Sequence, residues 1–232
     1  NSIAISGVGA YFGGDLSTGS HIGETSHSAY ETAENFFVFG NNGLKLYMLG
    51  DAGNTIDEYT CTTAYDRPSC SYVQQTSAVT GSNPLGITIH PDGSKIWHLD
   101  ATGNQIFEHT LSTPFDISTI TLHSQSKSIA SSSTHSKGLQ WNDDGSKIYF
   151  LNNNVNGYLY EYTCADYDIS TCSANISTDT GFGTYTWDFH WSNDGKTMYT
   201  LRYTTLSVHS WDCTTAWDFS SCTINSNNLS FG

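Results

Sequence analysis

The sequence contains one pattern four times, with a period of about 50 residues. Each copy has a turn glycine preceded by Asn or Asp, and further along an aromatic residue followed by Asp. The glycines are Gly43, Gly93, Gly145 and Gly195, and the aromatic–Asp pairs are Tyr65-Asp66, Phe115-Asp116, Tyr167-Asp168 and Trp217-Asp218. Because both series keep the same spacing from copy to copy, the repeat reflects the fold.

Within one copy, apolar residues alternate with polar ones, which is typical of half-buried β-strands. In the second copy, Ile87 and Ile89 precede the turn, and a returning strand begins near Ile96. The Asp-Gly turn between them supplies the positive φ angles that a tight hairpin needs. A third strand over 105–110 and a weaker fourth strand over 119–122 follow. Four antiparallel strands in each copy predict the blade of a β-propeller.

We therefore predict an all-β protein, a β-propeller built from four four-stranded blades. It is either a four-bladed ring or part of a larger ring. The propeller domain covers 35–232, with repeats at about 35–84, 85–136, 137–186 and 187–232. Residues 1–34 form an N-terminal extension that acts as a closing or donor strand. The Ser-rich stretch 124–136 is expected to be an exposed loop between blades.

The six cysteines fall into three close pairs, each of which brackets an aromatic–Asp loop. The pairs are Cys61/Cys70, Cys164/Cys172 and Cys213/Cys222. Their spacing is not that of a zinc or redox motif, so it predicts three local disulfides formed in an oxidising compartment. The sequons at Asn175 and Asn228 are consistent with a secreted glycoprotein. We expect an extracellular protein, at a cell surface or in a virion.

Charge is scarce and mostly negative. The chain has 8 Lys and Arg against 22 Asp and Glu, a formal net charge of −14. Binding to nucleic acid needs a cluster of cations, so we expect no nucleic-acid partner. Apolar runs are far shorter than the roughly 20 residues that span a bilayer, so we expect no membrane insertion.

The chain starts without Met, which suggests a removed signal peptide or a processing site.

Motifs for catalysis or metal binding are missing from the sequence. The nine histidines form no HxH or HxxxH pair, and neither a GxSxG motif nor a phosphate-binding loop occurs. Enzymes with a propeller fold gather polar residues at the central channel, but here the residues after the second strands are mixed: Gly50, Asp100, Asn152 and Arg202. We expect no catalytic residue, no metal ligand and no cofactor. Calcium remains open at 142–144 and 152–154, where turn chemistry also explains the Asn and Asp residues.

A glutamate recurs at one repeat position, as Glu58, Glu108 and Glu161. Catalysis would need one copy to differ from the others. The repetition therefore predicts a structural role, with hydrogen bonds inside each blade.

The second repeat resembles a known family. Residues 92–118 include Asp-Gly-Ser-Lys-Ile-Trp and, later, Phe-Asp-Ile-Ser, and they are similar to the repeats of YVTN/NHL-like β-propellers. The resemblance implies a propeller of a kind found in secreted, cell-surface and phage virion proteins. Such propellers usually have six to eight blades. The chain is then a complete small propeller, half of a ring closed by a second copy, or part of a longer protein.

The N-terminal extension lies outside the repeat and alternates apolar residues with Ser and Gly. Its apolar residues are Ile3, Ile5, Val8, Tyr11 and Phe12. One interpretation is a strand that completes the last blade of its own ring. The other is a strand that adds to the sheet edge of a neighbouring copy and so joins subunits into an oligomer or fibre.

From these observations the main functional hypothesis is a non-enzymatic, secreted, structural or adhesive propeller. It would be a building block of an extracellular filament, a cell surface or a virion. The alternative is a monomeric carbohydrate- or protein-binding propeller whose exposed Tyr and Trp side chains stack on sugar rings. A propeller lactonase or hydrolase is the second alternative.

Overall fold

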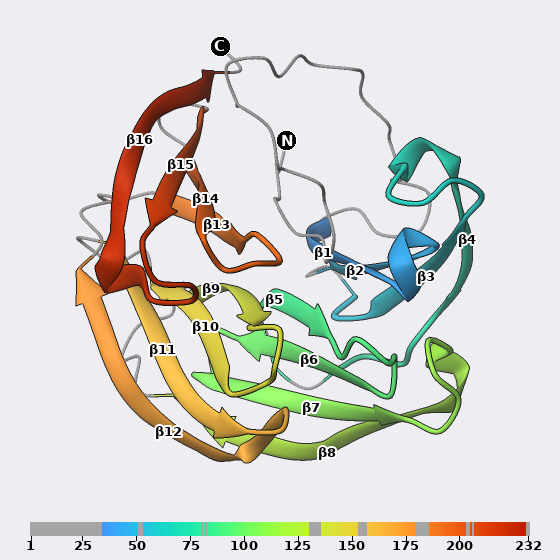
Figure 1. Ribbon diagram of the computed structural model, residues 1–232. Coiled ribbons are helices and arrows are strands. Elements are labelled where there is room, and N and C mark those ends of the chain that lie inside the picture. Colours follow the sequence, from blue (N-terminus) through green and yellow to red (C-terminus); the bar gives the residue numbers. More distant parts are fainter. Residues whose placement is uncertain are drawn as a thin grey trace.

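Each repeat folds into one antiparallel sheet of four strands (Figure 1). The computed structural model describes residues 34–50, 53–79, 81, 83–129, 136–152, 157–179, 186–202, 205 and 207–230. In every sheet the strands pair in the order in which they occur in the chain. The described residues contain no α-helix, only 3₁₀ turns at Asn41–Gly43, Arg67–Ser69, Ile117–Thr119 and Phe219–Ser221.

The four sheets are the blades of a propeller. Blade 1 contains β1 (Glu34–Gly40), β2 (Lys45–Gly50), β3 (Ile56–Cys61) and β4 (Cys70–Gln75). Blade 2 contains β5 (Pro84–Ile89), β6 (Lys95–Asp100), β7 (Gln105–Leu111) and β8 (Ile120–Ser128). Blade 3 contains β9 (Ser136–Trp141), β10 (Lys147–Asn152), β11 (Tyr158–Ala165) and β12 (Asp168–Asp179). Blade 4 contains β13 (Thr186–Trp191), β14 (Thr197–Arg202), β15 (Ser207–Cys213) and β16 (Cys222–Ser230).

The first strand of each blade lies nearest the centre, and the fourth lies at the outside (Figure 1). Inner strands of successive blades pack on one another, β1 on β5, β5 on β9 and β9 on β13. The predicted fold class, a four-bladed β-propeller, is confirmed.

The two ends of the sheets differ in their connections. At one end, which we call the turn end, lie the Asx-Gly turns between first and second strands and the aromatic–Asp loops between third and fourth strands. At the other, which we call the loop end, lie the connections between second and third strands and the linkers from blade to blade.

At the turn end, each turn glycine packs against the aromatic ring of its own blade. Gly145 has φ +71°, and a Cβ atom there would lie 2.2 Å from the Tyr167 ring. A Cβ atom on Gly195 would lie 2.4 Å from the Trp217 ring. Only glycine combines this left-handed backbone with so close an approach. The aromatic residues also have positive φ, 58° at both Tyr167 and Trp217.

Successive blades bury different sides against each other. We call the side of a blade toward the following blade its forward face, and the opposite side its rear face. Blade 1 packs forward residues Tyr47, Leu49 and Ile56 on rear residues Ile87, Ile89 and Ile96. Blade 2 packs Trp97, Leu99 and Ile106 on Leu139, Trp141 and Ile148. Blade 3 packs Tyr149, Leu151 and Leu159 on Phe189, Trp191 and Met198. The hydrophobic core is therefore divided among the junctions between blades.

The forward face also holds the aromatic–Asp loop of the next blade by hydrogen bonds. The Tyr149 hydroxyl donates to the backbone carbonyl oxygen of Trp217 at 2.7 Å, and the Lys147 ammonium donates to the same oxygen at 3.1 Å. Equivalent bonds join Tyr47 to the Phe115 carbonyl at 2.7 Å and Lys95 to the Tyr167 carbonyl at 3.4 Å. We call this arrangement the grip.

The recurring glutamates orient the lysines of the grip. Lys147 lies 3.0 Å from Glu161, Lys95 lies 3.3 Å from Glu108, and Lys45 pairs with Glu58. Glu58 also accepts a hydrogen bond from the Ile117 backbone N–H of the next blade at 3.1 Å. These contacts give the glutamates the structural role that their repetition predicts, and they extend it across a blade junction.

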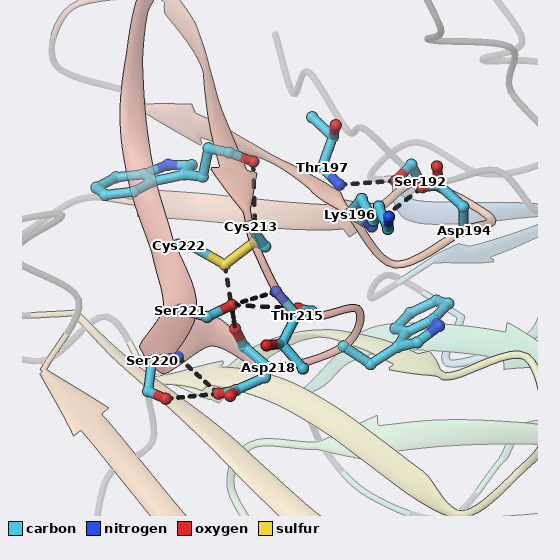
Figure 2. Close-up of a disulfide and its surroundings, with 12 residues drawn as sticks. Ser192, Asp194, Lys196, Thr197, Cys213, Thr215, Asp218, Ser220, Ser221 and Cys222 are labelled. Atoms are coloured by element: carbon cyan, nitrogen blue, oxygen red, sulfur yellow. Dashed lines mark hydrogen bonds between the residues drawn. A yellow bond between two sulfur atoms is a disulfide. The ribbon is translucent and has the colours of Figure 1, made fainter.

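The three predicted disulfides are present, joining Cys61 to Cys70, Cys164 to Cys172 and Cys213 to Cys222. Figure 2 shows the last of them closing the loop between β15 and β16. Inside that loop, the Ser221 hydroxyl donates to the carbonyl oxygens of Asp218 at 2.8 Å and Thr215 at 3.2 Å (Figure 2). The disulfides are compatible with an extracellular protein. In the described ranges no helix has the length and apolar character to cross a membrane.

One local expectation is wrong. The Ser-rich stretch 124–136 was expected to be a loop, but β8 continues to Ser128. Ser126 pairs with Phe107 and Ser128 with Gln105, so the backbone groups of this polar segment that face β7 are satisfied by the sheet. An outer strand with one neighbour and exposed side chains needs few apolar residues, so composition is a poor guide to it.

The structure does not test the predicted glycosylation sites or the predicted assembly residues. Asn175 and Asn228 lie on the outer strands β12 and β16, at the edges of their sheets. Their glycosylation stays a prediction. The five apolar residues proposed for assembly, Ile3, Ile5, Val8, Tyr11 and Phe12, lie outside the described residues.

The second blade supplies a test of the disulfides. It has Leu111 paired with Ile120 where the other blades have cystines. We expect the double substitution Cys213→Leu/Cys222→Ile to lower the free energy of unfolding by about 2 kcal/mol, because it frees a short loop in the unfolded chain. Urea unfolding measures this. Cys213→Ala/Cys222→Ala, which also loses the apolar contact, should lose more; equal stability of all three proteins would contradict the prediction.

Candidate functional site

The copies of the repeat agree at the turn end and differ at the loop end. One inner-strand position is occupied in turn by Phe36, Gly86, Gly138 and Asp188. The second strands end at Gly50, Asp100, Asn152 and Arg202, which pair with the first residues of the inner strands, Glu34, Pro84, Ser136 and Thr186. In a repeat scaffold, function is expected where copies depart from one another, usually on the varied loops. The loop end is therefore the candidate functional face.

Asp100 at this end has a structural role. Its carboxylate accepts hydrogen bonds from the backbone N–H groups of Asn83 at 3.1 Å and Gly103 at 2.8 Å. A Cβ on Gly81 would lie 2.6 Å from the same carboxyl group. Asp100 thus shapes the two connections beside it.

Lys137 occupies an unusual environment at the loop end. It belongs to β9 and is only 7% exposed. Its ammonium lies 3.6 Å from the centre of the Trp187 ring, which belongs to β13 of the next blade. Burial lowers the pKa of Lys137 to about 8, and the nearby Asp188 carboxylate opposes part of this shift. An amine with this pKa exchanges protons near neutral pH.

Glycines bring the inner strands close together beside Lys137. Gly138 has φ +62°, and a Cβ there would lie 2.7 Å from Asp188 Oδ1. A Cβ on Gly86 would lie 2.8 Å from the backbone carbon of Gly138. Asp188 itself is 2% exposed and accepts a hydrogen bond from the Phe189 backbone N–H at 2.9 Å. The buried carboxylate and the buried amine are therefore held on neighbouring inner strands with little freedom.

Several buried polar atoms of blade 4 have no hydrogen-bond partner among the described residues, and two of them belong to a cross-strand pair. They are the Thr186 hydroxyl and Nε of Arg202, and both atoms are buried. Thr186 and Arg202 face each other across β13 and β14. Buried polar groups are nearly always satisfied in folded proteins, so an orphaned pair is a feature that calls for a water molecule or a polar ligand.

We call Lys137, Thr186, Trp187, Asp188 and Arg202 the loop-end site. It combines an amine that can act as a base, a guanidinium that can bind an anionic oxygen, and an indole ring. A purely structural role for Lys137 is the simpler alternative, because a cation over an indole ring also stabilises a junction. Sequence reasoning missed the site. The available signal was that Lys137 and Trp187 hold the same repeat position in adjacent copies.

Three histidines, which the sequence does not connect, meet in blade 2. His98 and His109 are fully buried, and His98 Nδ1 lies 2.7 Å from His109 Nε2. The backbone N–H of His123 donates to His109 Nδ1 at 3.1 Å. Since Nδ1 of His109 accepts, its proton is on Nε2, which donates to His98. Both rings of the pair are therefore neutral.

The pKa values agree with this arrangement. Burial, together with the nearby His98 and His123, lowers the pKa of His109 to about 2. Burial also lowers the pKa of His190, on the inner strand β13, to about 4. These rings carry no charge at neutral pH.

No group of three or more His, Cys, Asp or Glu side chains in the described part of the chain is placed to hold a metal ion. At the proposed calcium turn, Asn142 Oδ1 accepts from the Lys147 backbone N–H at 2.9 Å. Asp144 Oδ1 accepts from the Ser146 backbone N–H and from the Asn142 amide, both at 2.8 Å. These two oxygen atoms are therefore used within the turn. Residues 153 and 154 of the other proposed stretch lie outside the described residues, and calcium binding stays an untested expectation.

Comparisons with known proteins find similarity in structure but not in sequence. No protein-family model matches the sequence, and no curated protein is similar to it. A proposed 6-phosphogluconolactonase from Bacteroides fragilis superposes with a TM-score of 0.58 at 13% identity, over 90% of this chain and 58% of its own. A proposed 6-phosphogluconolactonase from Bacteroides uniformis gives 0.58 at 11% identity, over 85% and 55%. The periplasmic gluconolactonase of Pseudomonas aeruginosa gives 0.54 at 14% identity, over 86% and 54%.

Because the identities are low, these similarities support the fold and nothing beyond it. The chain spans little more than half the length of these structures. They also correct one expectation. The sequence predicted a protein without enzymatic activity, whereas these propellers are named as lactonases. The prediction rested on missing motifs, and a site assembled from different blades leaves no motif in the sequence.

The histidine pair predicts acid sensitivity. In the unfolded chain His109 binds a proton below about pH 6.5, whereas in the folded protein it stays neutral, so stability is intact above pH 6.5 and falls as the pH drops. We expect a loss of about 2 kcal/mol between pH 7 and pH 4.5 from this residue. The variant His98→Phe/His109→Tyr, which copies Phe150 and Tyr162 of blade 3, should lose correspondingly less.

Urea unfolding at a series of pH values measures the difference between variant and parent. His190 remains in both proteins, so a part of the acid sensitivity should persist. Identical pH dependence of the two proteins would show that the pair does not control acid stability.

Proposed function

We propose that the protein is an extracellular β-propeller hydrolase that opens the ring of sugar-derived lactones at its loop-end site. The observation that carries the proposal is the buried amine of Lys137, whose pKa is lowered to about 8. Strongly shifted pKa values gather at functional sites because a general base works best near the ambient pH. The names of the structural relatives supply the class of substrate.

The chemistry needs one base and one site for negative charge. The neutral amine of Lys137 takes a proton from a water molecule while the water oxygen attacks the lactone carbonyl carbon. The bond from that carbon to the ring oxygen then breaks, and the ring oxygen takes the proton back from the Lys137 ammonium. The product is a hydroxy acid. We assign to Arg202, at the end of β14, the stabilisation of the negative charge of the intermediate or of the product carboxylate.

The neighbours of Lys137 tune its amine. Burial favours the neutral form, whereas Asp188 favours the ammonium, so the pKa lies between the value of a fully desolvated amine and that of an exposed lysine. The Trp187 ring, 3.6 Å from Nζ, fixes the position of the amine. The orphaned Thr186 hydroxyl can serve as a hydrogen-bond partner for a sugar hydroxyl.

Lys137 should control lactone hydrolysis. We expect Lys137→Met to lower kcat/KM for gluconolactone or 6-phosphogluconolactone by about 100-fold or more, since a general base contributes that much. Lys137→Arg keeps a cation over Trp187 but cannot give up its proton, so it should be as inactive as Lys137→Met. In the parent protein, kcat/KM should rise between pH 7 and pH 9 as the amine becomes neutral.

The matched control is Lys196→Met at the exposed turn end, which should leave hydrolysis unchanged. Rates are compared with the spontaneous reaction at each pH. If the parent protein hydrolyses no lactone, the proposed activity is wrong. If Lys137→Arg is fully active, Lys137 is a structural cation and not the base.

A second candidate function is supported by the outer strands. Val73 on β4 is 47% exposed and Ile224 on β16 is 53% exposed, and both strands end their sheets. An open edge with an apolar side chain can pair with another strand. This supports a building block of an extracellular filament or surface that associates with itself through β4. The glycosylation sequon on β16 would block that edge, whereas β4 carries no sequon.

Particle size tests the second candidate. We expect Val73→Lys to reduce self-association at least about tenfold in apparent dissociation constant, because a lysine on an edge strand opposes strand pairing. Light scattering over a dilution series measures it, with Ile224→Lys as the control. A parent protein that is monomeric at all concentrations would reject this candidate.

A further inference from the structure

The third strand of blade 4 carries a serine and a histidine whose side chains share a hydrogen bond. Ser207 is the first residue of β15, and His209 lies two positions further along the same strand. The Ser207 hydroxyl oxygen is 2.9 Å from His209 Nε2. Residues two apart on a strand lie on one face of the sheet, so the strand itself holds the two groups together. A hydroxyl within hydrogen-bond reach of an imidazole is the arrangement that an activated serine nucleophile needs.

Among the four copies of the repeat, this pair occurs in blade 4 only. The same two positions hold Thr55 and Asp57 in blade 1, Gln105 and Phe107 in blade 2, and Tyr158 and Tyr160 in blade 3. Blade 1 also joins a hydroxyl to an acceptor, since Thr55 donates to the Asp57 carboxylate at 3.2 Å. A carboxylate is a far weaker base than an imidazole. Blade 1 therefore shows the structural version of the contact, and blade 4 replaces its acceptor by a base.

Ser207 lies just below the surface at the loop end. It is 5% exposed, and its hydroxyl oxygen is 2.5 Å from that of Thr205. Thr205 is exposed and belongs to the connection between β14 and β15. When the neutral His209 ring carries its proton on Nδ1, Ser207 donates to Nε2 and Thr205 donates to Ser207. Because an exposed side chain changes rotamer within nanoseconds, a rotation of Thr205 lets a ligand reach the Ser207 hydroxyl.

A group that stabilises negative charge faces Ser207 across the sheet. Arg202, the last residue of β14, is the register partner of Ser207. Side chains of directly paired residues lie on the same face of a sheet, with Cβ atoms about 5 Å apart. Nε of Arg202 is buried and has no hydrogen-bond partner among the described residues. A donor with unused capacity beside a nucleophile is suited to the oxyanion that forms when the nucleophile attacks a carbonyl group.

We propose that Ser207 is a nucleophile for carboxylic esters, with His209 as its general base and Arg202 as the group that stabilises the oxyanion. This activity goes beyond the hydrolysis of lactones by Lys137. It adds a covalent route on another strand, and it requires neither Lys137 nor a cyclic substrate. The two routes share only Arg202.

The reaction has two halves, and the proton returns in each. His209 Nε2 takes the proton of the Ser207 hydroxyl while Oγ attacks the carbonyl carbon of the ester. The bond from that carbon to the alcohol oxygen breaks, and the leaving oxygen takes the proton from the imidazolium, so an acyl-serine remains. Water then attacks the acyl carbon and gives a proton to Nε2. The bond to Oγ breaks, Oγ takes this proton back, and the carboxylic acid is released.

A fluorophosphonate probe tests the nucleophile. Attack of the Ser207 oxygen on phosphorus displaces fluoride and leaves a stable phosphonyl ester, which mass spectrometry of the chain and its peptides detects. We expect the folded full chain to take up one probe molecule, on Ser207, and the chain unfolded in urea to take up none. Ser207→Ala should take up none. The matched control is Ser220→Ala, which removes an exposed hydroxyl that bonds to the Asp218 carboxylate and should be labelled like the parent.

Two variants separate a base from a hydrogen-bond acceptor at position 209. His209→Gln offers an amide oxygen to the Ser207 hydroxyl but cannot take its proton, so the labelling rate should fall about 100-fold or more. His209→Phe, which copies Phe107 of blade 2, should react as slowly. Urea unfolding shows that each variant is folded. Labelling of His209→Gln at the parent rate would overturn the proposal, because His209 would then only position the hydroxyl.

Turnover is followed with p-nitrophenyl acetate. We expect the parent to release p-nitrophenol faster than the spontaneous reaction, and Ser207→Ala to match the spontaneous rate. A folded parent that takes up no probe, or takes it up on another residue, would overturn the inference. Lactone hydrolysis is measured on the same parent preparation. Labelled Ser207 without lactone hydrolysis would reject only the proposed function, whereas lactone hydrolysis without the label would reject only this inference.

Discussion

The rest of the fold depends on how each blade holds the aromatic–Asp loop of the next one. At the junction of blades 3 and 4, a single backbone oxygen, that of Trp217, accepts from the Tyr149 hydroxyl and the Lys147 ammonium. The oxygen is available because Trp217 has positive φ and its ring packs against Gly195. A tight turn, a strained aromatic residue and a charged pair therefore act together at this junction. The first two recur in all four copies, and the charged pair recurs in blades 1 to 3. Since each element is needed by two blades, the turn end has little room to vary.

Because the turn end is constrained in this way, the copies of the repeat differ mainly at the loop end. The close approach of Gly86 and Gly138 brings the inner strands together, and the buried carboxylate of Asp188 lies in the place that a side chain on Gly138 would take. Lys137 is buried beside this point, so its amine is desolvated by the packing of the scaffold itself. A rigid ring of blades thus supplies what a flexible loop could not, namely a buried amine at a fixed distance from an indole ring.

The sequence could predict whatever is repeated. Gly145 and its counterparts, the strand alternation and the cystines all recur, and repetition turns weak local signals into a confident fold class. The sequence could not predict contacts between residues that only one copy of the repeat contains. His98, His109 and His123 are brought together by pairing of three strands, and the register needed to see this is not present in the spacing of the histidines. Lys137 and Trp187 were missed for the same reason, because they touch only when one blade packs on the next. The expected absence of enzymatic activity was wrong because it treated a lack of linear motifs as a lack of chemistry.

The small number of cations makes their positions informative. The chain has 8 Lys and Arg residues against 22 acids. Lys45, Lys95 and Lys147 pair with the recurring glutamates, so they are explained by the fold. Lys137 is balanced in part by the buried Asp188 carboxylate and lies over the Trp187 ring, whereas Arg202 Nε has no hydrogen-bond partner among the described residues. Both cations lie at the loop end of adjacent blades, where burying a positive charge is costly. Under the proposed hydrolase function, the charge of Arg202 that the fold leaves unmatched is balanced by negative charge on the ligand. A reaction that ends in a carboxylate brings such a charge, and an apolar or cationic ligand would not.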